Sequence, residues 1–234
     1  RYYTSGNCRI ILSGRYDEAV IERLDRELGA AIRRGPAARA AVPIPENVPR
    51  RLTIDHPDTV QTAIRVGRRL FNRHHPDYHG LYVLNTMLGG YFGSRLMENI
   101  RERKGFTYNI YSMIDTMLYD GLFCIGTEVG NEFVEATLAE IHRELRRLRE
   151  APAAKDELEM VRSYLLGYFL TTLDGPFHIA DWIKTLVTES LPATFFEEAV
   201  ATVRSIGTKE LRDLAGKYFA EEEMWEVVVG APKQ

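Results

Sequence analysis

An arginine and a tyrosine, Arg101 and Tyr108, are the side chains of this sequence best suited to holding a peptide backbone. They flank a basic turn that contains Lys104 and Gly105, at a predicted junction between a helix and a strand. A guanidinium presents several hydrogen-bond donors in a fixed plane, and a phenol presents one further donor that a carbonyl oxygen can accept. Composition alone favours a plainer alternative, in which Arg101 is a surface residue of a helix and Tyr108 a half-buried residue of a strand.

The histidines give little support for a metal site. His75 and His79 are four residues apart, a spacing that suits two ligands on one face of a helix. Pro76, however, disfavours a helical conformation at His75, and the sequence contains neither HExxH nor HxxEH. We therefore expect a polar loop before a helix, and we predict no metal ligands in this chain.

Other chemistries are poorly represented. The stretch LGGYFGSRL matches neither GxxxxGK[ST] nor GxGxxG and follows a predicted helix, so a nucleotide site is not expected. Two arginine-rich runs, 101–104 and 143–149, are interleaved with glutamate, and the net charge is −3, which argues against nucleic acid as a partner. No Ser/His/Asp or Cys/His set is recognisable. Cys8 and Cys124 lie in apolar runs far apart, which favours buried thiols over a disulfide.

The composition is that of an ordinary globular protein, with 45% hydrophobic and 27% charged residues in a chain of 234. This length allows one large domain or two small ones. No apolar run reaches the roughly 18–20 residues that span a bilayer. Because the sequence begins at Arg1, inside what reads as a structured segment, we expect it to be a fragment of a longer protein.

The first part of the chain reads as one strand and one helix, followed by a linker. Residues 8–13 are apolar and predict a buried strand. Asp17 is a candidate N-cap for a helix whose apolar stripe ends at Gly29. Residues 35–49 contain four prolines among alanines and predict an extended connection.

The rest of the chain separates into a block rich in strands and a block rich in helices, which predicts an α+β fold. We expect a two-layer sandwich, with helices packed on one face of a mostly antiparallel sheet. The predicted strands are 51–55, 59–66, 106–116, 122–129 and 224–229, and the predicted helices are 77–88, 94–103, 131–151, 155–171, 176–190, 193–204 and 208–219.

The two ends of the chain resemble each other. An aromatic pair ending at Tyr3 precedes an apolar run that stops at Gly14, and a second pair ending at Phe219 precedes a valine-rich run that stops at Gly230. The spacing from the second aromatic to the glycine is 11 residues in both cases. Duplication of one fold would produce this pattern. Chance is the alternative, since such strands are common.

A long segment resembles a known family. Residues 88–112, LGGYFGSRLMENIRERKGFTYNIYS, are similar to a motif of the pitrilysin/insulinase family of zinc metallopeptidases, which includes the mitochondrial processing peptidases. The resemblance extends over nearly the whole chain. Other segments before and after the motif occur in the same order as in the family, namely QTAIRVGRRLF, DYHGLYVLNTMLGG and GLFCIGTEV. The motif is long, so chance similarity is not expected.

The resemblance implies that this chain is the non-zinc, C-terminal inactive domain of such a peptidase. Residues 1–35 would be the last strand and helix of a preceding homologous domain, residues 36–49 a linker, and residues 50–234 the second domain. The chain lacks HxxEH, so zinc would be held by a partner half that carries this motif. The partner would lie in the same polypeptide or in a separate subunit of a homodimer or heterodimer, and this chain alone would be inactive.

The resemblance also implies a role for the two residues considered first. Arg101 and Tyr108 would reach from the non-zinc half across a closed cavity and orient a peptide substrate at its scissile bond. The alternative is a proteolytically inactive structural or assembly subunit, similar to a core protein of a respiratory complex. Such a protein could have lost the pair, and both residues are intact here.

Overall fold

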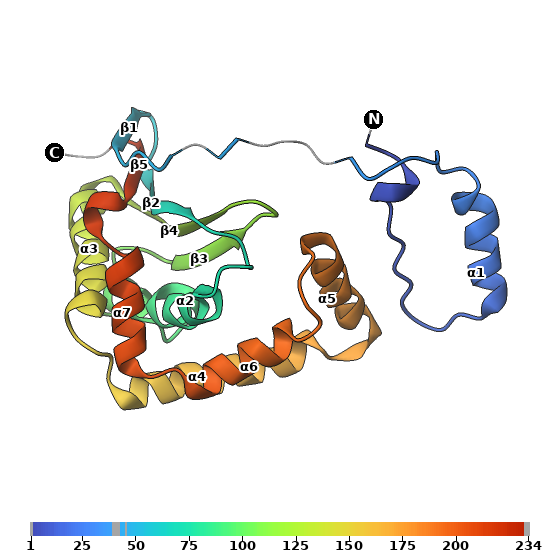
Figure 1. Ribbon diagram of the computed structural model, residues 1–234. Coiled ribbons are helices and arrows are strands. Elements are labelled where there is room, and N and C mark those ends of the chain that lie inside the picture. The colour runs from blue at the N-terminus through green and yellow to red at the C-terminus, as the bar shows by residue number, and fades with distance from the viewer. Residues whose placement is uncertain (1, 39–42, 45, 232–234) are drawn as a thin grey trace. The chain divides into compact units, whose positions relative to one another are not determined.

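The computed structural model describes residues 2–38, 43–44 and 46–231, and the chain forms two compact units (Figure 1). The sheet unit comprises residues 45–167 and 193–234. The terminal unit comprises residues 1–44 and 168–192. Part of the predicted linker, 39–42 and 45, lies outside the described residues, and the domain boundaries at 35 and 50 stay a prediction.

The sheet unit is built on a mixed sheet of five strands in the order β1-β5-β2-β4-β3. β1 pairs with β5 in parallel, while the pairings β5–β2, β2–β4 and β4–β3 are antiparallel, as the sequence predicted for most of the sheet. The long β2–β4 ladder runs from Gln61 opposite Gly130 to Leu70 opposite Gly121. The strands are β1 (Arg51–Asp55), β2 (Gln61–Leu70), β3 (Ile110–Thr116), β4 (Gly121–Gly130) and β5 (Trp225–Gly230).

Helices contribute the second layer of this unit, so the α+β prediction is confirmed. Every second residue of β2 from Thr62 to Val66 is fully buried, which shows that one face of the sheet is covered. Facing residues of the helices, such as Leu81, Ile141 and Leu211, are also almost completely buried. The helices are α2 (Tyr78–Asn85), α3 (Val134–Glu150), α4 (Lys155–Thr172), α6 (Phe195–Ser205) and α7 (Thr208–Tyr218), and α4 continues into the terminal unit.

The terminal unit contains α1 (Glu18–Leu24), with a π-helical turn at Asp25–Gly29, and α5 (Gly175–Glu189). The carboxylate of Asp17 accepts a hydrogen bond of 3.2 Å from the Val20 amide, so the predicted N-cap is confirmed.

The prediction of a strand over residues 8–13 is wrong. A strand needs a neighbouring strand to satisfy its main-chain donors and acceptors. Within the described part of the terminal unit no strand lies beside this segment. The similarity between the chain ends therefore corresponds to a paired strand only at β5. Cys8 and Cys124 are free thiols, and they are half-buried rather than buried as predicted.

Over the residues that the structure covers, none of the helices combines the length and the apolar character needed to cross a bilayer.

Candidate functional site

Arg101 lies in the second of two π-helical segments that follow α2. α2 continues into a π-helical turn at Thr86–Gly90, and a second π-helical stretch covers Met97–Arg103. The side chains of Leu96 and Ile100 are completely buried and fix this second stretch against the core. π-Helical turns are rare and occur frequently at functional sites. The second stretch lies within the segment 88–112 that the sequence singled out, and the first turn overlaps its start.

A glycine ends the second stretch and redirects the chain toward β3. Gly105 has φ of 64°, in the left-handed region that glycine adopts without steric cost. Its amide donates to the carbonyl of Arg101 at 3.0 Å, and the Phe106 amide donates to that of Ile100 at 3.1 Å. These bonds satisfy carbonyls at the helix end. The chain therefore turns back directly after Arg101 and brings Tyr108 to the same place.

Arg101 and Tyr108 are brought together. The guanidinium carbon of Arg101 lies 5.3 Å from the centre of the Tyr108 ring and 4.7 Å from the centre of the Phe92 ring. The Arg101 side chain is 24% exposed, and its Nη1 lies 3.2 Å from Oε1 of Glu102. Tyr108 is 86% exposed and Phe92 is 64% exposed. The guanidinium thus contacts two aromatic rings that face solvent. Sequence reasoning missed Phe92, although an apolar ring within a glycine-rich loop is an available signal.

A pocket of about 210 Å³ lies beside Tyr108. Its wall includes Arg65 and Tyr111, which belong to one row across the open face of the sheet because both pair with Gly126. Gly126 makes room for Tyr111, since a Cβ there would lie 2.6 Å from the Tyr111 hydroxyl oxygen. This row therefore forms part of the pocket wall next to Tyr108. The remaining lining residues are Gln61, Thr107, Asn109, Thr127 and Glu128.

Hydrogen bonds hold the rim of this pocket in place. Arg65 Nη1 donates to the carbonyls of Ile64, at 2.9 Å, and Thr127, at 3.1 Å. The hydroxyl of Thr107 donates to the carbonyl of Glu128 at 2.7 Å. The loop that carries Tyr108 is thereby attached to β4.

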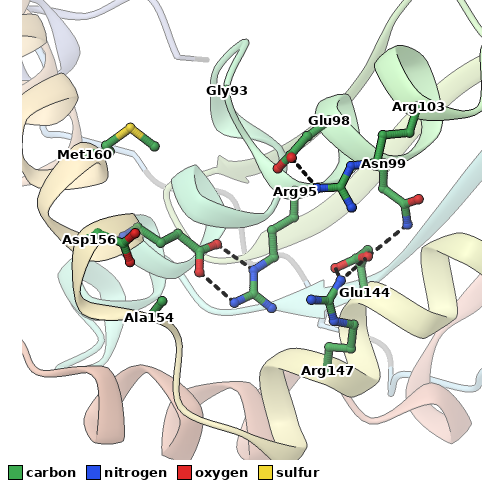
Figure 2. A pocket seen from close by; sticks show the side chains of 11 residues that line it. Gly93, Arg95, Glu98, Asn99, Arg103, Glu144, Arg147, Ala154, Asp156 and Met160 are labelled. Carbon is green, nitrogen blue, oxygen red and sulfur yellow. Dashed lines mark hydrogen bonds and ion pairs between the residues drawn. The ribbon is translucent and has the colours of Figure 1, made fainter.

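A second cavity, of about 240 Å³, is lined by residues from 93–103, from α3 and from the start of α4, several of which form charge pairs (Figure 2). Arg95 donates two hydrogen bonds to Glu157 of α4, at 2.6 and 2.8 Å. Burial by itself would lower the pKa of Arg95, but these bonds and the charge of Glu144 raise it above its usual range. Asn99 and Arg147 both donate to Glu144. Because the charges satisfy one another, this cavity is better explained as an internal network than as a ligand site.

The histidines near α2 pack against aromatic rings. His75 stacks on Phe71 with ring centres 3.7 Å apart, and His79 contacts Phe195 at 4.5 Å. Across the described residues, no group of three or more His, Cys, Asp or Glu side chains is placed to hold a metal ion. Burial lowers the pKa of His79, and the charge of Glu198 only partly opposes this effect.

This lowered pKa predicts a pH dependence of stability. As pH falls below about 6.5 the unfolded chain binds a proton at residue 79 before the folded chain does. We therefore expect the free energy of unfolding to be highest above that pH and to decrease as pH falls toward the lower folded pKa. Denaturation of His79→Gln at several pH values should show a weaker decrease than the wild type. His56→Gln, at an exposed position, is the control, and equal slopes for wild type and His79→Gln would contradict the prediction.

Comparison with known proteins agrees with the resemblance seen in the sequence. The family described as "Peptidase M16 inactive domain" matches residues 1–165. The uncharacterized zinc protease YmxG of Bacillus subtilis is 26% identical over 174 residues, which cover 74% of this chain and 42% of that protein. An uncharacterized zinc protease of Mycobacterium bovis is 32% identical over 128 residues, which cover 53% of this chain and 29% of that protein.

Among solved structures, a peptidase M16 inactive domain from Pseudomonas fluorescens is similar, with a TM-score of 0.82 and 24% identity. The similarity covers 94% of this chain and 52% of that one, so the chain spans about half the length of its relatives or less. The resemblance to the pitrilysin/insulinase zinc metallopeptidases is thus confirmed. Since the matched residues 1–165 make up more than half of the chain, this protein belongs to the family of the peptidase M16 inactive domain.

Proposed function

We propose that this chain is the non-catalytic half of a zinc metalloendopeptidase and that it holds the peptide substrate through Arg101 and Tyr108. The observation that carries the proposal is the contact of the Arg101 guanidinium with the exposed Tyr108 ring, beside an open pocket. Membership of the peptidase M16 inactive-domain family supports it.

The zinc belongs, in this proposal, to a partner half that carries HxxEH, in the same polypeptide or in a separate subunit. This fits the donor set of the present chain, since its described residues include no cluster suited to a metal. Zinc in the partner would supply an activated water for attack on the scissile carbonyl. The residues of this chain bind and orient the peptide.

Arg101 and Tyr108 are suited to different parts of that task. The guanidinium can donate to substrate carbonyls in a fixed plane and so bind the peptide before the reaction and during it. The Tyr108 phenol can donate to the oxygen on which negative charge develops. The contact between guanidinium and ring, worth about 0.5–1 kcal/mol at exposed sites, holds the two groups together.

Replacement of Arg101 tests the proposal. In the full-length protein with its catalytic half, Arg101→Ala should raise KM for an unstructured peptide about tenfold and change kcat much less. A charge-assisted hydrogen bond contributes about 1.5–3 kcal/mol, and one that acts equally on bound substrate and transition state appears in KM.

Arg103→Ala is the matched control, because Arg103 lies two residues away, pairs with Glu98 and is exposed. It should leave both constants nearly unchanged. Equal kinetics for Arg101→Ala and the wild type would contradict substrate binding by Arg101. A zinc-loaded assembly with no peptide hydrolysis would instead favour a structural or assembly role.

A further inference from the structure

The short helical stretch that carries Arg101 is attached to the rest of the sheet unit by polar side chains on a separate face. Arg95 lies just before this stretch and Asn99 lies within it, and both line the cavity of about 240 Å³. Arg95 binds Glu157 of α4, whereas Asn99 binds α3 (Figure 2). Arg101 contacts the rings of Phe92 and Tyr108 instead. The polar face is thus available to set the position of the stretch without touching the candidate site.

Asn99 makes the more demanding of these contacts. Its Nδ2 donates to Oε1 of Glu144 at 2.8 Å and to Oε2 of Glu140 at 2.9 Å, both on α3. Glu144 is only 1% exposed and pairs with Arg147 Nη1 at 2.9 Å. Glu140 also pairs with Lys104 Nζ at 3.2 Å. One amide group thus joins two carboxylates, one of which is almost completely buried.

The burial of Glu144 restricts where Asn99 can lie. A buried carboxylate is costly unless it is paired and hydrogen-bonded, so the position of Asn99 relative to α3 is strongly restricted. α3 itself is fixed in the core by residues such as Ile141 and Leu145, which are fully buried. Asn99 therefore connects the π-helical stretch Met97–Arg103 to a rigid element.

We propose that Asn99 is a positioning residue for Arg101, acting through Glu140 and Glu144. This inference rests on the proposed role of Arg101 in substrate binding. Asn99 and Arg101 lie on one short stretch but point toward different neighbours, so a rotation that releases Asn99 from α3 also displaces the Arg101 guanidinium from Tyr108. The π-helical conformation makes this stretch irregular, so its position depends on contacts with α3 and α4.

A double-mutant cycle on the full-length protein with its catalytic half separates positioning from simple stabilisation. Asn99→Ala should lower kcat/KM for an unstructured peptide about fivefold. In the Arg101→Ala background, the same Asn99→Ala change should have almost no further effect, because the group that it positions is gone. Leu211→Ala, which removes a buried side chain from α7, is the stability control and should lower the melting temperature without lowering kcat/KM at temperatures where the protein is folded.

Exchange of donor and acceptor provides a second arm. Asn99→Asp places a third carboxylate beside Glu140 and Glu144 and should lower kcat/KM. Adding Glu144→Gln restores a donor opposite Asp and should recover part of the activity.

The outcomes distinguish this inference from the proposal on which it rests. Unchanged kinetics in Arg101→Ala would overturn the substrate-binding role and the positioning role together. An effect of Arg101→Ala combined with no effect of Asn99→Ala would overturn positioning alone. So would an equal effect of Asn99→Ala in both backgrounds, because it would show that Asn99 acts independently of Arg101.

Discussion

Tyr108→Phe is expected to lower kcat of the assembled peptidase by about 10²–10³, with little change in KM. Removing one preorganised donor to a developing oxyanion has effects of this size. The phenylalanine ring retains the contact with the Arg101 guanidinium, which lies 5.3 Å from the ring centre, so only the hydroxyl is lost. Because Tyr108 is 86% exposed, the change should leave folding almost unaffected.

The measurement is steady-state hydrolysis of an unstructured peptide by full-length wild type and variant, with melting temperatures recorded for both. Tyr119→Phe is the matched control, since Tyr119 is also partly exposed but lies in the turn between β3 and β4. A kcat unchanged in Tyr108→Phe would remove the oxyanion role. A fall in kcat that accompanies an equal loss of melting temperature would assign the effect to folding.

Gly89→Ala is expected to destabilise the sheet unit by about 1–3 kcal/mol, the usual cost of overpacking a core. A Cβ at this position would lie 2.5 Å from the main-chain nitrogen of Ser112 and 2.6 Å from its hydroxyl oxygen. Ser112 donates from Oγ to the carbonyl of Asn85 at 3.1 Å, which attaches the end of α2 to β3. The added methyl group would separate these elements. Glycine is required here because Ser112 lies so close to its Cα, not because the backbone is left-handed.

Gly90→Ala is a control within the same glycine pair. Its Cβ would lie no closer than 3.3 Å to a neighbour, the Cβ of Thr86, so a shift of a few tenths of an ångström would remove the close contact. Chemical denaturation of both variants should therefore show a clearly larger loss of unfolding free energy for Gly89→Ala. Equal losses would show that close packing against Ser112 does not explain the glycine.

The parts of the fold that were predictable from sequence are those set by local periodicity. A helix was predicted over residues 131–151, and Val134, Leu138, Ile141 and Leu145 form the buried stripe of α3 at helical spacing. A strand was predicted over residues 59–66, where the first part of β2 lies, and the cap at Asp17 marked the start of α1. Such features depend on residues close together in the chain, so one sequence suffices to find them.

The parts that were not predictable depend on distant partners. Residues 8–13 are as apolar as a strand, but no neighbouring strand pairs with them in the described chain. The parallel pairing of β1 with β5 joins residues more than 170 positions apart, Leu52 and Val227 among them. The bonds from Asn99 to Glu140 and Glu144 likewise connect segments whose contact no local pattern indicates.

The sequence by itself determined the α+β class, the family resemblance and the identity of Arg101 and Tyr108 as the residues to consider, because motifs and periodicity are properties of the linear chain. Only the tertiary structure decided that the guanidinium and the ring are in contact. A spacing of seven residues does not fix a distance. The left-handed turn at Gly105 reverses the chain, and the bonds of Thr107 to β4 hold the following loop. Those two constraints, one local and one long-range, place Tyr108 against Arg101.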